Sequence, residues 1–121
     1  MIIAVFKAGT EMSFVVNNLE IPTDDDGYLL NLADWTPQVA EALAEQEQLV
    51  LTQAHWEILN LLRDFYRTYE LSPAMRALVK HTAKTLGEEK GRSLYLLQLF
   101  PPSPAKIASK IAGLPRPTNC L

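Results

Sequence analysis

Three pairs of a hydroxyl residue followed by proline divide most of this chain into helical segments. Each pair places an N-cap hydroxyl directly before a proline at the first helical position, where the missing N–H costs no hydrogen bond and φ is already set. The pairs are Thr36-Pro37, Ser72-Pro73 and Ser103-Pro104. Thr52 is a fourth N-cap candidate, and Gly87 and Gly113 stand where helices commonly end. These signals predict helices over residues 37–49, 53–70, 73–86, 90–100 and 104–112.

The stretch before residue 34 has the pattern of short strands instead. Residues 13–16 and 19–21 are apolar-leaning runs on either side of Asn17-Asn18, and asparagine tolerates the left-handed backbone angles of a two-residue hairpin turn. Pro22 is expected to end the second strand, because it cannot donate to a ladder. Residues 2–6 are either a third strand or a disordered tail.

The helix expected over residues 53–70 has the longest apolar stripe and is the expected centre of the fold. Its large apolar residues recur at three- and four-residue spacing; they are Trp56, Leu59, Leu62, Phe65, Tyr66 and Tyr69. Leu94, Leu97 and the neighbours Tyr95 and Phe100 are expected to supply a second apolar face. We therefore predict a mainly α (α+β) fold, a small helical bundle with an N-terminal β-hairpin and an extended C-terminal arm. The expected parts are a non-native or disordered extension (1–11), a single helical domain with the hairpin (12–113) and a mobile arm (114–121).

Composition excludes several classes of protein. No apolar run approaches the roughly 18–20 residues that span a bilayer, so no contact with a membrane is expected. The net charge of -3 is unlike that of a strongly basic nucleic-acid-binding domain. One cysteine cannot form an internal disulfide, and one thiol with two histidines, His55 and His81, does not make a zinc site. We expect a small cytoplasmic domain with no metal and no cofactor.

Cys120 is the one residue whose position indicates chemistry. It follows Pro115 and Pro117, which prevent a helix and favour an extended chain. Lone cysteines are usually buried and inert, but a thiol at the tip of such an arm is expected to be exposed. Exposure gives the access that sulfur exchange needs, because a thiolate must attack a sulfur–sulfur bond. The neighbouring C-terminal carboxylate opposes ionisation of this thiol, whereas Arg116 and Lys110 favour it, so we expect a docking partner to activate it.

The ending Ile111-Ala-Gly-Leu-Pro-Arg-Pro-Thr-Asn-Cys-Leu121 closely resembles the C-terminal signature of the TusE/DsrC family of sulfur-carrier proteins. Other matching stretches follow in unbroken order from about Met12. They are Gly27-Tyr28-Leu29, Leu51-Thr-Gln-Ala-His-Trp-Glu57, Arg63-Asp-Phe-Tyr66, Ser72-Pro-Ala-Met-Arg76, Gly87-Glu-Glu-Lys-Gly91 and Leu99-Phe-Pro101. The resemblance implies a small helical bundle with an N-terminal hairpin and a mobile C-terminal arm. It also implies that sulfur is carried as a persulfide on Cys120.

A second position separates the branches of this family. Members that serve dissimilatory sulfite reductase have another cysteine eleven positions before the penultimate one, where this chain has Ser109. A hydroxyl cannot form a disulfide or trisulfide, so the single-cysteine pattern resembles TusE. The resemblance then implies a sulfurtransferase that accepts sulfur from a TusBCD-like donor complex. The acceptor would be an MnmA-like thiouridylase that 2-thiolates the wobble uridine of tRNA, with tRNA itself contacted indirectly.

The residues beside Cys120 are expected to form the arm and to dock on these partners. They are Gly113, Leu114, Pro115, Arg116, Pro117 and Thr118. Because the resemblance begins near Met12, we also predict that Met12 is the native initiator and that residues 1–11 are a mis-annotated extension. The intact mass of the native protein tests this prediction.

Two other functions stay open. One keeps the sulfur chemistry but places it in sulfur oxidation or sulfite metabolism, since other single-cysteine relatives exist. The other is a regulatory or DNA-binding helical module with an incidental thiol. Its supporting feature is the pair of adjacent helices around Ser72, without a cluster of base-reading and phosphate-binding residues on the second helix. A basic stripe beside His81 would be either a docking stripe for an acidic partner or tRNA or a solvated helix face, and we interpret it as the solvated face; it consists of Arg76, Lys80 and Lys84. His55 is expected to be a satisfied structural histidine or an exposed first-turn residue rather than a ligand.

Overall fold

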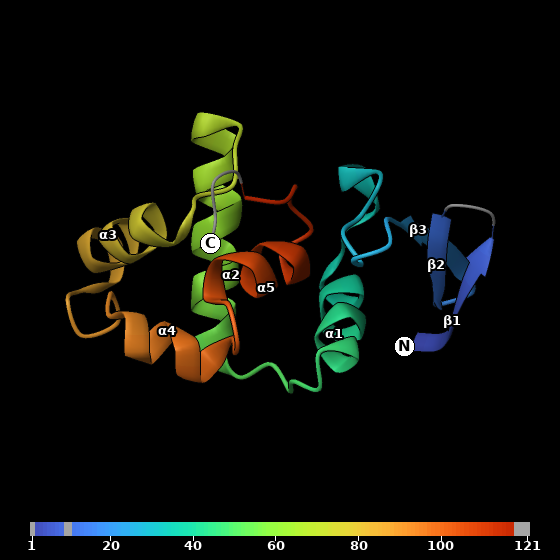
Figure 1. Ribbon diagram of the computed structural model, residues 1–121, viewed down its shortest axis with the longest axis horizontal. Coiled ribbons are helices and arrows are strands. Elements are labelled where there is room, and N and C mark those ends of the chain that lie inside the picture. The colour runs from blue at the N-terminus through green and yellow to red at the C-terminus, as the bar shows by residue number, and fades with distance from the viewer. Residues whose placement is uncertain (1, 9–10, 118–121) are drawn as a thin grey trace.

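The computed structural model describes the backbone of residues 2–8 and 11–117 and the side chains of residues 12–117. Its elements are β1 (Ile2–Ala8), β2 (Glu11–Val16), β3 (Leu19–Thr23), the 3-10 helix η1 (Leu32–Asp34), α1 (Pro37–Gln46), α2 (Gln53–Tyr69), α3 (Met75–Leu86), α4 (Ser93–Leu99) and α5 (Pro104–Ile111). The sheet lies at one end of the molecule, α3 and α4 lie at the other, and α1 lies between the sheet and α2 (Figure 1). The predicted fold class is therefore confirmed. Within the described part of the chain, every helix falls short of the length and apolarity that crossing a membrane requires.

The sheet is antiparallel, with strand order β1-β2-β3. Asn17 and Asn18 form the predicted turn between β2 and β3, with φ of 50° and 68°. Positive φ at both positions matches the twist of a two-residue hairpin. β1 pairs with β2, so the structure has the third strand rather than the tail. The native status of residues 1–11 stays a prediction.

β3 continues through Pro22, where the sequence analysis expected it to end. Val16 pairs with Leu19 beside the turn, and Ser13 pairs with Pro22 three positions further along. Hydrogen-bonded and non-hydrogen-bonded pairs alternate in an antiparallel ladder, so the Ser13–Pro22 pair falls at a non-hydrogen-bonded position. The missing N–H of Pro22 therefore costs no ladder bond, and β3 is an edge strand of this sheet.

The helix-start signals are confirmed at some positions and wrong at one. Thr36 caps α1 as predicted, its Oγ1 accepting a hydrogen bond from the N–H three residues on, at 3.1 Å. α3, however, begins at Met75 rather than Pro73, and Ser72 does not cap it. The Ser72 hydroxyl instead donates to the carbonyl oxygen of Pro115, at 2.5 Å. A tertiary contact thus takes the hydroxyl that the local signal assigned to a cap.

His55 is structural, as predicted. The backbone N–H of Thr52 donates to His55 Nδ1 at 3.1 Å, and His55 Nε2 lies 2.8 Å from the carbonyl oxygen of Leu99. Since Nδ1 accepts, the ring proton is on Nε2, which donates to Leu99. The side chain is 8% exposed and joins the start of α2 to the end of α4.

α5, not α2, is the centre of the helical part. It packs against each of α1, α2, α3 and α4. Small buried residues on α5 let its neighbours approach closely; they are Ala105, Ala108 and Ser109, each fully buried. The expectation of a central α2 is wrong because its apolar stripe is buried only at its first half, and Tyr69 at its end is 56% exposed.

The expected second apolar face is confirmed at Phe100, which is fully buried, and Tyr95 packs partly buried against the core. It is wrong at Leu94 and Leu97, whose side chains are 66% and 40% exposed. Leu96 on α4 takes their place, since it is fully buried and lies four residues before Phe100 on the same face.

Candidate functional site

The predicted site residues divide into two groups. Cys120 and Thr118 lie outside the residues that the structure describes. Gly113, Leu114, Pro115, Arg116 and Pro117 lie within them and follow directly on α5. We call residues 113–117 the arm base, because they connect the central helix to the segment that carries Cys120.

Gly113 begins the arm base at a place that admits no side chain. Its φ is +75°, a conformation that L side chains rarely adopt. A Cβ at this position would lie 2.3 Å from Cδ1 of Trp35. The N–H of Gly113 donates to the carbonyl oxygen of Lys110 at 3.0 Å. The chain can therefore turn out of α5 here only because residue 113 is glycine.

The last carbonyl groups of α5 are satisfied by side chains from earlier in the chain. Trp35 Nε1 donates to the carbonyl oxygen of Ile111 at 2.9 Å, and Arg63 donates to that of Ala112 at 2.7 Å. The Arg63 guanidinium also lies 3.8 Å from the centroid of the Trp35 ring. Burial lowers the pKa of Arg63, and the neighbouring Arg67 charge lowers it further, but an arginine stays charged. This cation therefore sits favourably at the negative end of the α5 dipole.

The next two residues of the arm base are fixed to the body. Leu114 is 3% exposed, and its N–H donates to the carbonyl oxygen of Ser109 at 2.9 Å. The Pro115 carbonyl accepts the hydrogen bond from Ser72, which is 4% exposed. The chain after residue 113 thus starts as packed structure, and the predicted mobility of the arm stays a prediction for residues 118–121.

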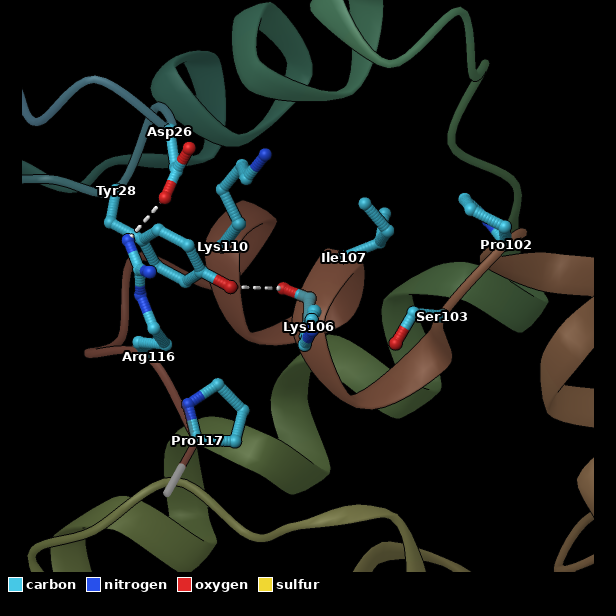
Figure 2. A pocket seen from close by; sticks show the side chains of 9 residues that line it. All are labelled: Asp26, Tyr28, Pro102, Ser103, Lys106, Ile107, Lys110, Arg116 and Pro117. Carbon is cyan, nitrogen blue, oxygen red and sulfur yellow. Dashed lines mark hydrogen bonds and ion pairs between the residues drawn. The ribbon is translucent and has the colours of Figure 1, made fainter. Parts of the chain in front are cut away.

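Arg116 is held by an acidic loop from the other end of the sequence. Its Nη2 lies 2.6 Å from Oδ2 of Asp26 and 3.4 Å from Oδ2 of Asp24. Its guanidinium carbon lies 5.0 Å from the centroid of the Tyr28 ring. The hydrogen bond to Asp26 raises the pKa of Arg116; the charges of Asp26 and Asp24 and the Tyr28 ring add to this effect, while desolvation partly offsets it. Figure 2 shows the Arg116 side chain extended toward Asp26 alongside the Tyr28 ring.

Residues 24–28, which we call the acidic loop, are themselves well anchored. Oδ1 of Asp24 accepts hydrogen bonds from the N–H groups of Asp26 and Tyr28, at 2.9 and 3.0 Å. The Tyr28 hydroxyl donates to the carbonyl oxygen of Lys106 on α5, at 3.1 Å. The loop therefore presents Asp26 to Arg116 from a defined position.

A cavity of about 530 Å³ lies between the arm base, the acidic loop and α5 (Figure 2). Its lining residues are Asp26, Tyr28, Pro102, Ser103, Lys106, Ile107, Lys110, Arg116 and Pro117. Lys110 is paired with Glu47 at 2.8 Å, so its charge is largely neutralised. The described lining contains no cysteine or histidine, and residues 12–117 hold no group of three acidic, histidine or cysteine side chains that could bind a metal ion. The described surroundings therefore hold the arm base, and the role of Cys120 as nucleophile stays a prediction.

Ser109, the position that the family resemblance uses to separate two branches, is fully buried on α5. Its hydroxyl has no hydrogen-bond partner among the described residues. The basic stripe lies on the exposed face of α3, and its three residues Arg76, Lys80 and Lys84 are exposed as expected of a solvated face. His81 is half-buried, with its ring 5.1 Å from that of Phe65.

The sequence analysis missed the residues that hold the arm base. The local sequence alone indicates an exposed turn for Asp26 and an N-cap for Ser72, yet they contact residues 90 and 43 positions away. The one signal that pointed to the acidic loop was the stretch Gly27-Tyr28-Leu29, since it belongs to the family resemblance.

This chain is similar to named proteins over most of its length. A family model described as "DsrC like protein" matches residues 15–121. A Haemophilus influenzae protein named "Sulfurtransferase TusE homolog" is 52% identical over 106 residues, which cover 88% of this chain and 97% of that protein. "Sulfurtransferase TusE" of Photorhabdus laumondii is 51% identical, with 88% and 96% covered.

Solved structures share the fold. The NMR structure of Allochromatium vinosum DsrC matches with a TM-score of 0.82 and 49% identity, covering 90% of this chain and 97% of that one. The crystal structure of the oxidized gamma-subunit of the dissimilatory sulfite reductase (DsrC) from Archaeoglobus fulgidus matches with a TM-score of 0.78 and 38% identity, covering 90% and 99%.

Proposed function

Because this chain belongs to the DsrC-like family, we propose that it is a sulfurtransferase of a sulfur relay, with Cys120 as the residue that carries the sulfur. The observation that carries this proposal is a single cysteine at position 120, in a C-terminal sequence that resembles the family signature. The relatives named sulfurtransferase TusE, at about half identity over nearly their whole length, support it. The arm base supports it physically, since it fixes the chain three residues before Cys120 and leaves the thiol on the segment beyond.

The transfer needs two exchange reactions and no net redox change. In the first, the Cys120 thiolate attacks the outer sulfur of a donor persulfide, a new sulfur–sulfur bond forms at Sγ, and the donor leaves as its thiolate. In the second, a thiolate of the acceptor attacks the outer sulfur on Cys120, takes it as a persulfide, and releases Cys120 as the thiolate. The outer sulfur keeps its proton in both reactions. The C-terminal carboxylate next to Cys120 opposes ionisation of its thiol, so the docked partner is expected to supply the activation.

The proposed donor is a TusBCD-like complex and the proposed acceptor an MnmA-like thiouridylase, acting in the cytoplasm on the wobble uridine of tRNA. Ser109 supports this branch, because it removes the second thiol that an internal disulfide would require. The names of the relatives that cover 88% of this chain support the same branch. Contact with tRNA then passes through the acceptor.

A second pathway is favoured by one observation. The solved relatives are titled DsrC, and the Allochromatium vinosum protein is 49% identical to this chain, close to the 52% of the TusE homolog. The same Cys120 chemistry would then serve sulfur oxidation or sulfite metabolism. Measuring 2-thiouridine in tRNA from cells that lack this protein separates the two, because only the first pathway predicts its loss.

Mass spectrometry of Cys120 after incubation with a persulfide donor tests the shared chemistry. We expect one added sulfur atom on Cys120, removed by a reductant. Cys120→Ser should keep the circular dichroism and unfolding midpoint of the wild type but take up no sulfur and fail to restore thiolation in cells. A variant that restores function fully would overturn the proposal and favour a regulatory or DNA-binding module.

A further inference from the structure

Two contacts from different parts of the chain hold the arm base, and they differ in burial. The Ser72 hydroxyl reaches Pro115 at 2.5 Å from a residue that is 4% exposed. The ion pair between Arg116 and Asp26, at 2.6 Å, joins side chains that are 51% and 61% exposed. The Ser72 hydrogen bond is half-buried, because Ser72 is buried and Pro115 is exposed, and it resists separation more than an exposed ion pair, which is weak and screened by salt. The Arg116 contact is therefore the one that can open while the fold stays intact.

The acidic loop is built to keep Asp26 in place for this contact. Oδ1 of Asp24 accepts hydrogen bonds from the backbone N–H groups of Asp26 and Tyr28. The other carboxylate oxygen of Asp24, Oδ2, faces Arg116. Tyr28 is 6% exposed, its hydroxyl is bound to α5, and its ring lies under the guanidinium of Arg116. The acidic loop and α5 together therefore form one binding site for the guanidinium of Arg116.

Opening this contact changes how far Cys120 can travel from the body. With Arg116 and Pro117 held, three residues separate Cys120 from the last fixed position, a reach of about 10 Å. When Arg116 is released and the buried Pro117 leaves its place with it, while Pro115 is still bound to Ser72, five residues separate them, a reach of about 17 Å.

We propose that Asp26 and Tyr28 are positioning residues for sulfur transfer: by holding Arg116 they set the exit point of the C-terminal segment and so the reach of Cys120. This inference rests on the proposed function. Cys120 can reach a shallow reaction site of a partner while Arg116 is held, whereas a deep site requires release of Arg116. The weakness of the ion pair suits such a carrier, because each docking event can open it at small cost.

The single cysteine provides a direct probe of this positioning. A nitroxide attached to Cys120 broadens the amide resonances of the body near which it spends time. In the wild type at low salt, we expect the broadening to be concentrated on the acidic loop and α5. Asp26→Asn should reduce it about two- to fivefold, the range expected for an exposed ion pair, and high salt should do the same to the wild type.

Asp25→Asn is the matched control, because it removes the same charge from the same loop without touching Arg116: no bond of Asp25 is seen among the described residues. It should keep the wild-type pattern, and Asp26→Glu should restore most of the broadening. Equal broadening in the Asp26→Asn and Asp25→Asn proteins, with no response to salt, would overturn the inference. A structural defect would instead change the circular dichroism, which should be the same for all variants.

The failure of this inference is separable from failure of the proposed function. The labelled thiol carries no sulfur, so the broadening measures position alone. Sulfur loading of unlabelled wild-type protein measures the function alone. If sulfur loads normally and Asp26→Asn transfers it to every acceptor with wild-type KM and rate, Asp26 does not position the arm for the reaction.

Discussion

Replacing Gly113 by alanine perturbs the point where the arm base leaves α5. Two costs add at this position. A Cβ at φ +75° costs about 1–2 kcal/mol of strain. The same Cβ would lie 2.3 Å from Cδ1 of Trp35, and displacing that ring in a packed environment costs about 1–3 kcal/mol more. We therefore expect Gly113→Ala to lower the free energy of unfolding by about 2–5 kcal/mol.

Gly27→Ala isolates the first cost. Gly27 has a similar φ of +91°, but the nearest atom to an added Cβ is Cδ of Lys110 at 3.5 Å, an ordinary contact. Gly27→Ala should lower the free energy of unfolding by only about 1–2 kcal/mol. Urea unfolding followed by tryptophan fluorescence measures both, because Trp35 reports on the site itself. With a slope of about 1–3 kcal/mol per molar urea, the two midpoints should differ by about 1 M. Equal midpoints would show that the Trp35 contact does not fix the exit of the arm base.

Three further substitutions, two of them paired with a control substitution, test individual contacts of the fold. Ser72→Ala should lower the free energy of unfolding by about 1–2 kcal/mol, because it leaves the Pro115 carbonyl unpaired. The control Ser103→Ala breaks no capping bond and should lower it by less than about 0.5 kcal/mol. Similar losses for the two variants in urea unfolding would contradict the Ser72 contact. Leu96→Ala should lower the free energy of unfolding by about 2–4 kcal/mol, because Leu96 is fully buried, and Leu94→Ala by less than about 0.5 kcal/mol, because Leu94 is 66% exposed. The reverse order in calorimetry would refute the placement of α4. Gly91→Ala brings a Cβ within 2.5 Å of the Ala83 backbone and should lower the thermal midpoint by several degrees, so an unchanged midpoint would argue against that close approach.

The helices and the hairpin could be predicted because their signals are local. A hydroxyl before proline, a pair of asparagines and an apolar stripe each act within a few residues, and α1, α5 and the β2–β3 turn start where these signals place them. Ser72 shows the limit of such signals, since its hydroxyl bonds a carbonyl 43 residues away and α3 starts two residues late. Pro22 shows another, because its effect on a strand depends on pairing register and edge position rather than on proline alone.

The central position of α5 and the binding of Arg116 by the acidic loop depend on contacts that no local sequence pattern encodes. α5 has 8 residues and α2 has 17, so the apolar pattern that includes the small residues of α5 extends over fewer helical turns than the stripe of α2. The value of these small residues appears only when four helices pack on them. Likewise, three acidic residues in a turn have the composition of a solvated loop. Asp26 contacts its partner Arg116 only when folding brings these residues, 90 positions apart, together. Cys120 was found from its position and the family signature, without any structural signal.

Passage of one labelled sulfur atom through Cys120 tests the central claim most directly. The chain is loaded with isotopically labelled persulfide sulfur, freed of donor, and mixed with a thiol-bearing acceptor protein. The account predicts that the label leaves Cys120 and appears on the acceptor cysteine in equal amount, and that Cys120→Ser protein transfers none. Label that reaches the acceptor equally well from the Cys120→Ser protein, or that never binds a freely reactive Cys120, would contradict it.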